Sequence, residues 1–347
     1  MRIIMQPLNL SKQQGFTLLE LLIASAIGVF ISAAAAFMFV SSKHAYVETE
    51  RYARVQENGR YAMQAISMNL DRIGFWSYHN GTISLVNESI IPKNSCNTEV
   101  DFPLIHSDPK VIHGLSMDRM LWSGKGSQAG TCLAPNYSKT SDVLLIRALS
   151  AQPIWGVHSG DPSIATVYDK KRYYAAMGAN MVGTLRFFKG DAANSLKSGA
   201  DAAIYDRAEV FQYQPYLYYI QEQTRTVGSQ KIKLPVLVRQ DITKTNQSIV
   251  DGVEEMRFMW FYVKNKLGTY LTSDEVQKKE PNNQAWGSVR AVKTYLLIRS
   301  ELPDKAIPAI KKEYELGSDT ITKKDQYHRY VMTSTINLTN MNPPSDE

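Results

Sequence analysis

Side chains that could perform catalysis or hold a metal ion are present, but their spacing matches no common arrangement. The six histidines do not show the H-x-x-x-H spacing that places two imidazoles on one helix face. The sequence also lacks a G-x-S-x-G nucleophile turn, a phosphate loop and a dinucleotide-binding fingerprint. We therefore predict a protein that is not an enzyme and that binds no cofactor or metal. The histidines are His44, His79, His106, His113, His158 and His328.

One carboxylate occupies an unusual position. Glu20 directly precedes an uncharged apolar run from Leu21 to Val40. At about 1.5 Å per residue this run forms a helix of roughly 30 Å, which matches the hydrocarbon core of a bilayer. A carboxylate beside such a segment is costly unless a cation compensates it, so it indicates a functional role. Gly15 leaves its backbone open to a peptidase, and we interpret Gly15–Phe16 as a cleavage site.

The segment Gly15–Ala24, with the sequence GFTLLELLIA after a leader that carries Lys12, resembles the class III signal of type IV prepilins and type II secretion pseudopilins. The resemblance implies that a prepilin peptidase cuts after Gly15 and methylates the new amine of Phe16. It also implies that Glu20 compensates the N-terminal amine of a neighbouring subunit inside a helical bundle. An ordinary secretory signal is the alternative, because Ser32–Ala36 could supply a small-residue cleavage site.

The elements that must position these residues divide the chain into three parts. They are a leader (1–15), a long helix (16–75, membrane-spanning over 16–40) and a β-rich head (76–347). The basic residues of the leader favour a cytoplasmic N-terminus, which places the head in the periplasm beyond the inner membrane. The composition, 44% hydrophobic and 21% charged, is that of a globular chain. The net charge of +6 is dispersed and indicates no particular partner.

The helical pattern continues beyond the apolar run. Five apolar residues recur at spacings of three, four and seven and form one stripe, with the charged residues largely off it. We predict one helix to about Ile73, with Gly59 as a point where it could bend and Gly74–Trp76 as its end. The stripe consists of Val55, Ala62, Ile66, Leu70 and Ile73.

Both cysteines, Cys96 and Cys132, lie in a loop-rich stretch after the helix. In a translocated domain this favours a disulfide between them. Two unpaired thiols are the alternative. A metal site would need a second, closely spaced pair of ligands.

Strand patterns dominate the rest of the chain, and two of them flank residues 226–230 as a hairpin would. The predicted fold class is α+β, with a long N-terminal transmembrane and amphipathic helix packed on a mainly antiparallel β head. The aromatic stretch Phe211–Tyr219 could stack bases or sugars, but strands enrich tyrosine in any case. The predicted strands are Asp142–Arg147, Leu185–Phe188, Tyr216–Gln221, Leu234–Gln240, Met256–Val263, Ala291–Arg299 and Tyr330–Leu338.

Four segments of the head, Ser141–Leu144, Ile249–Phe258, Val289–Lys293 and Arg329–Leu338, resemble the PilW family of minor pilins. The resemblance implies a pilin-like fold and a structural protein that primes type IV pilus assembly and sits at or near the pilus tip. Its partners would be other minor pilins, the major pilin, the prepilin peptidase and a tip adhesin. Two alternatives stay open: a J-type minor pseudopilin of type II secretion, and an adhesive or DNA-binding tip module, which would need a basic groove with interleaved aromatics.

Overall fold

The structure, a computed structural model, describes residues 15–75, 84–85, 120–129, 133–154, 168–177, 184–190, 209–227, 229–241, 245–279 and 281–341. Two compact units are present, Met1–Tyr52 and Ala53–Glu347. Cys96 and Cys132 lie outside the described residues, so their disulfide stays a prediction. The helices are α1 (Leu18–Leu70), α2 (Gly126–Ala129), α5 (Ser273–Lys279) and the 3₁₀ helix η5 (Pro281–Ser288).

The strands form three sheets within the described residues, and all pairs except β1–β5 are antiparallel. The predicted α+β class is confirmed. The strands are β1 (Ser84–Leu85), β2 (Leu121–Lys125), β3 (Asp142–Leu149), β4 (Tyr173–Met177), β5 (Thr184–Lys189), β6 (Glu209–Val227), β7 (Gln230–Gln240), β8 (Asn246–Asp251), β9 (Val253–Lys264), β10 (Leu267–Thr272), β11 (Val289–Arg299), β12 (Lys311–Leu316), β13 (Asp319–Lys324) and β14 (Arg329–Asn337).

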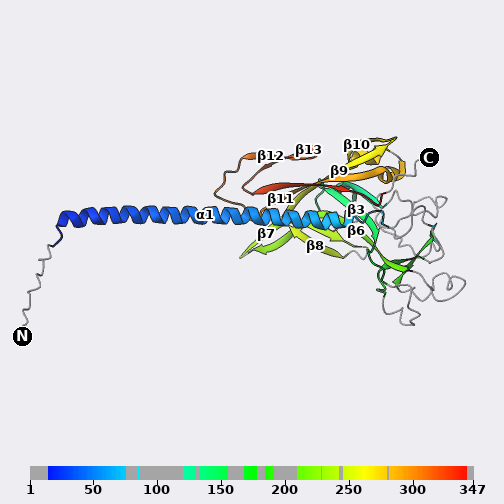
Figure 1. Ribbon diagram of the computed structural model, residues 1–347, viewed down its shortest axis with the longest axis horizontal. Coiled ribbons are helices and arrows are strands. Elements are labelled where there is room, and N and C mark those ends of the chain that lie inside the picture. The colour runs from blue at the N-terminus through cyan, green and yellow to red at the C-terminus, as the bar shows by residue number, and fades with distance from the viewer. Residues whose placement is uncertain are drawn as a thin grey trace, which may run out of the picture. The chain divides into compact units, whose positions relative to one another are not determined.

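The part of α1 that belongs to the second unit buries the predicted apolar stripe. In Figure 1 this part lies beside β11 on one side and beside β7 and β8 on the other. Ile66, Leu70 and Ile73 are all fully buried. The described residues show Gly59 in a different role from a bend: a Cβ there would sit 3.0 Å from Cδ1 of Ile298 in β11. Because glycine has no side chain, the helix can lie close to the sheet at this position.

The helix ends earlier than predicted, at Leu70, and a turn follows. Gly74 adopts a positive φ of 77°, a conformation that glycine reaches without steric cost. The turn is fixed by a segment far away in the sequence, because Asn340 Nδ2 donates to the carbonyl of Asp71 at 2.8 Å. A Cβ at Gly74 would lie 2.6 Å from the carbonyl oxygen of Asn340. Asn340 thus completes the turn at the C-terminal end of α1.

The largest sheet is built on β6, which is 19 residues long. Its first part pairs with β4, its middle with β3 and its last part with β7. The β6–β7 pair is the predicted hairpin around 226–230. In the same sheet, β3 is buried along its whole length, as its continuous apolar run indicates.

A second sheet has the order β10-β9-β11-β14. The predicted strand Met256–Val263 lies within β9, where Met256, Phe258, Trp260 and Tyr262 share one face and are all buried. The ring of Trp260 contacts that of Trp286 in η5 edge to face at 5.2 Å. Such a contact adds to the hydrophobic stabilisation of both residues.

The third sheet is the β12–β13 hairpin, which charged contacts attach to the second sheet. The Arg257 guanidinium in β9 donates to the Asp319 carboxylate at 2.8 Å, and Lys125 in β2 lies 3.2 Å from the same oxygen. Arg329 in β14 donates to Glu254 at 2.7 Å, and Lys323 in β13 lies 3.2 Å from that carboxylate. The hairpin is therefore held through β13, near both ends of that strand, by ion pairs to neighbouring elements.

Candidate functional site

The predicted cleavage site lies directly before the first turn of α1. Phe16 is 89% exposed. A Cβ added at Gly15 would meet no described atom within 4 Å. The Gly15–Phe16 peptide bond is therefore outside the helix and open on its sides. This is a geometry in which a peptidase could bind an extended backbone.

Glu20 forms hydrogen bonds with Thr17 at the start of the helix. The backbone N–H and the hydroxyl of Thr17 both donate to Glu20 Oε2 at 2.9 Å. The N–H of Glu20 donates back to the Thr17 hydroxyl at 3.3 Å. This reciprocal arrangement is a capping box, which satisfies N–H groups that the first helical turn leaves without partners. The T-x-x-E spacing at 17–20 is a sequence signal for this capping box, which the interpretation of Glu20 as a charge awaiting a cation did not include.

The apolar part of α1 is exposed along its length, with Leu22, Phe30 and Phe37 each more than half exposed. By length and composition, α1 qualifies as a membrane-crossing helix. Because so much apolar surface is unstable in water, this segment requires a lipid or protein environment.

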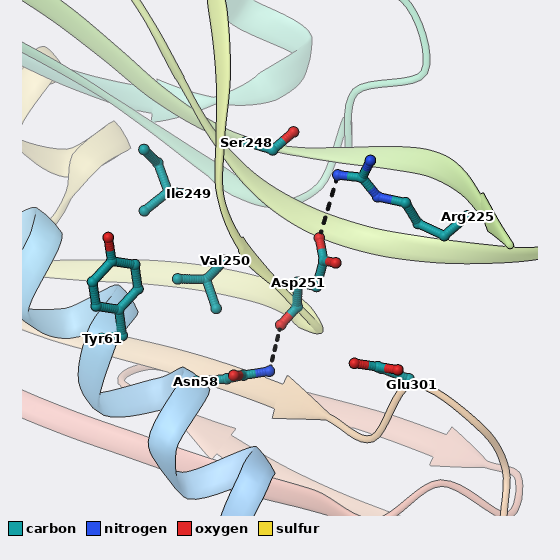
Figure 2. Close-up of a pocket in the computed structure, with 8 residues that line it drawn as sticks. All are labelled: Asn58, Tyr61, Arg225, Ser248, Ile249, Val250, Asp251 and Glu301. Atoms are coloured by element: carbon teal, nitrogen blue, oxygen red, sulfur yellow. Dashed lines mark hydrogen bonds and ion pairs between the residues drawn. The ribbon is translucent and has the colours of Figure 1, made fainter. Parts of the chain in front are cut away.

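A second candidate is a recess in the unit Ala53–Glu347, with a volume of about 340 Å³. Figure 2 shows the residues that line it, which come from α1, β6 and β8, together with Glu301 just after β11. Its lining residues are Asn58, Tyr61, Arg225, Ser248, Ile249, Val250, Asp251 and Glu301.

The polar contacts of the recess join α1 to the strands. Asn58 Nδ2 donates to the backbone carbonyl of Asp251 at 3.1 Å. The Asp251 carboxylate lies 3.6 Å from the Arg225 guanidinium, and both side chains are more than a third exposed. An exposed ion pair of this kind contributes at most about 1 kcal/mol. The recess offers hydrogen-bonding and charged groups with which a partner could bind.

The structure describes two of the six histidines, and they lie on different parts of the fold. His44 lies on α1, and His328 is buried with Nε2 3.0 Å from an Asp304 carboxylate oxygen. His79, His106, His113 and His158 lie outside the described residues. In the part of the chain that the structure describes, no group of three histidine, cysteine or acidic residues could hold a metal.

The aromatic stretch Phe211–Tyr219 contributes mainly to the core. Tyr213, Tyr218 and Tyr219 are buried. The Tyr218 hydroxyl accepts a hydrogen bond from Asn69 Nδ2 of α1 at 2.7 Å, and burial raises its pKa to about 12. These rings are therefore not available to stack on bases or sugars, which supports the interpretation of this stretch as a strand.

Two family models match the chain. Residues 217–340 match PilW, described as Type IV Pilus-assembly protein W, and residues 10–36 match the Prokaryotic N-terminal methylation motif. The first match covers the hairpin β6–β7 and every later strand. The second covers Gly15, Phe16 and the Thr17–Glu20 capping box. No curated protein and no solved structure matches the chain.

Proposed function

We propose that this chain, a PilW-like pilin of type IV pili with a prepilin N-methylation motif, is a minor pilin that primes filament assembly and occupies a position at or near the filament tip. The observation that carries this proposal is the exposed Gly15–Phe16 bond, which directly precedes a capped apolar helix. The families matched are structural pilin proteins, and membership of a pilus assembly family implies contacts with other pilins and with the pilus machinery.

The proposed processing takes place at two atoms. The prepilin peptidase would hydrolyse the peptide bond between Gly15 and Phe16 and release the leader. The new α-amine of Phe16 would then receive one methyl group from a methyl donor. Because the capping box begins at Thr17, cleavage leaves its hydrogen-bonding groups intact. The mature helix therefore keeps its N-terminal cap.

The role proposed for Glu20 combines two partners. In a single chain, Thr17 satisfies one carboxylate oxygen of Glu20, while none of the described residues places a cation beside its charge. In an assembled bundle, the methylated amine of a neighbouring Phe16 would supply that cation. A buried carboxylate is tolerable only when such a charge compensates it. We therefore assign Glu20 to subunit assembly in addition to helix capping.

The apolar helix and the prepilin signal indicate anchoring in the inner membrane. We propose that the head faces the periplasm before it enters the filament. The head unit extends from Ala53 to Glu347, and its size supports a position near the tip, where fewer neighbours restrict it.

N-terminal mass spectrometry of membrane fractions tests the processing. The expected mature chain starts at Phe16 with a methylated amine, and Gly15→Ala should slow its appearance because the added methyl group occupies the open side of the bond. A start after Ala34 or Ala36 would indicate signal peptidase and would contradict the proposal. Immunogold labelling of sheared filaments then tests the position, since label distributed along the shaft would exclude a tip role.

A further inference from the structure

We propose that the outer edge of β10 receives an extended strand of another pilin subunit, so that the partner strand continues the β10-β9-β11-β14 sheet. This inference rests on the proposed function, because it names a surface through which the chain would contact another subunit. Sheet edges bind extended segments through main-chain hydrogen bonds, and alternate side chains supply the specificity.

The geometry of the β9–β10 hairpin shows which backbone groups point outward. Asn265 and Lys266 form its turn with positive φ values of 51° and 63°, the pattern of a type I′ turn. In such a two-residue hairpin, the closing pair Lys264–Leu267 is hydrogen-bonded, and the pairs alternate from there. Gly268 and Tyr270 therefore direct their N–H and C=O groups away from β9.

An independent contact supports this alternation. Thr272 is the next residue in the outward series, and its N–H donates to the Glu275 carboxylate at 2.7 Å. That N–H is therefore not used in the pairing with β9. The two preceding outward residues, Gly268 and Tyr270, have no hydrogen-bond partner among the described residues.

Two other edge strands, β2 and β8, have covering contacts from side chains, whereas Gly268 and Tyr270 of β10 have none among the described residues. In β2, the carbonyl of Ser123 accepts a hydrogen bond from Gln277 Nε2 at 2.6 Å. In β8, the carbonyl of Asp251 accepts one from Asn58. Proteins usually cover or charge their edge strands, because an uncovered apolar edge pairs with other chains. Within the described residues, β10 pairs only with β9.

The side chains along β10 indicate the chemistry of the partner. Leu267 is 78% exposed and Tyr270 is 44% exposed. The Phe261 ring lies where a Gly268 side chain would be and is 5.2 Å from the Tyr270 ring. This aromatic pair stiffens the edge on one face. Leu267 and Tyr270 are three residues apart and so lie on opposite faces of the strand. The partner strand would therefore present apolar side chains on both faces of the sheet.

Charges at the two ends of β10 set the direction of the partner. Lys266 lies at the turn, and Asp274 and Glu275 lie in the first turn of α5 at the other end. The edge is thus positive at one end and, beside the first turn of α5, negative at the other, while Lys278 and Lys279 lie in the last turn of that helix. A complementary strand carries an acidic residue opposite Lys266 and a basic residue near the start of α5.

The test uses two substitutions at one position in the full chain. Tyr270→Pro removes the outward N–H without removing a hydrogen bond to β9, and proline is tolerated in an edge strand at such a position. Tyr270→Val is the matched control, because it also loses the ring but keeps the N–H. We expect sheared filaments to contain at least fivefold less of the Tyr270→Pro chain than of the Tyr270→Val chain, at equal membrane levels. Equal recovery of the two variants would overturn the inference.

Hydrogen exchange of the wild-type chain provides a second measurement that does not depend on the folding of a variant. The β10 amides at Gly268 and Tyr270 should exchange at least tenfold more slowly in the copurified pilin complex than in the chain alone. Unchanged exchange there overturns the proposed edge pairing. If the wild-type chain is absent from the filament fraction altogether, the proposed function is wrong. That outcome differs from one in which the chain enters the filament but β10 pairs with no partner strand.

Discussion

Gly59 of α1 lies against Ile298 of β11, so close that a Cβ would sit 3.0 Å from Ile298 Cδ1. Met332 of β14 contacts the same point, with its Cε 3.2 Å from that Cβ position. The helix therefore rests on the two strands through a position that has no side chain. The residue that lowers the intrinsic stability of the helix is the one that permits this contact.

Substitution at Gly59 should separate helix propensity from packing. Alanine improves helix propensity by about 1 kcal/mol, while its methyl group presses on the ends of two flexible side chains. We expect Gly59→Ala to change the free energy of unfolding by less than about 1 kcal/mol. Gly59→Leu should lower it by about 1–3 kcal/mol through overpacking. Urea unfolding of the full chain in detergent measures both, and a Gly59→Leu chain as stable as wild type would contradict the close contact.

Gly252, between β8 and β9, should tolerate substitution poorly. Its φ is 90°, and a Cβ would lie 2.6 Å from the carbonyl oxygen of Arg299. Its own N–H and C=O bond to Pro235 and Arg299 and so join two sheets. We expect Gly252→Ala to lower the free energy of unfolding by about 2 kcal/mol or more. The control is Asp251→Ala, which removes only an exposed ion pair. Equal effects of the two substitutions would show that the glycine is not required.

Arg329 should make stability depend on pH. Burial alone would raise the pKa of the Glu254 carboxyl, but hydrogen bonds from Arg329 and the nearby Lys323 hold it below its ordinary value. The hydrogen bond from Arg329 also lowers the pKa of Asp325. A carboxyl with a lowered pKa stabilises the fold above its unfolded pKa, and this contribution is lost as the pH falls through the folded value.

We therefore expect Arg329→Gln to cost about 2–4 kcal/mol at pH 7, because it leaves a mostly buried carboxylate short of a partner. The difference from wild type should shrink as the pH falls below the ordinary carboxyl pKa values of 4.5 and 3.8. Urea unfolding at pH 7 and at about pH 3.5 measures it. Arg225→Gln, in the exposed pair with Asp251, is the control and should cost less than about 1 kcal/mol. A difference that is the same at both pH values would contradict the prediction.

Three variants can separate the two roles of Glu20. Glu20→Gln keeps an oxygen that accepts a hydrogen bond from Thr17 but loses the charge. Thr17→Ala keeps the charge but loses the capping hydroxyl. Glu20→Ala loses both the charge and the capping oxygen. We expect normal cleavage in all three, with filament incorporation impaired in both Glu20 variants and near normal in Thr17→Ala. Quantitative immunoblotting of sheared filaments measures this. Normal incorporation of Glu20→Gln would reduce Glu20 to a capping residue.

The sequence predicted those elements whose pattern depends on local periodicity. The stripe from Val55 to Ile73 and the strand Met256–Val263 both follow from which side chains face a core, and both were found. The β10 edge and the β12–β13 hairpin were not predicted, because their residues are polar or exposed and give no alternation signal. The role of Gly59 depends on Ile298, more than two hundred residues away, so only the folded chain reveals it.

The hydrogen bond from Asn340 to Asp71 joins positions 269 residues apart. At a synthesis rate of 5–20 residues per second, roughly 15–50 s separate the appearance of the two residues. During this interval Ile66 and Leu70 have emerged, but β11 and β14 are still incomplete. An unfinished chain thus exposes the face of α1 that the head will later cover. Translation time therefore sets how long this apolar face of a newly inserted subunit stays open to proteases.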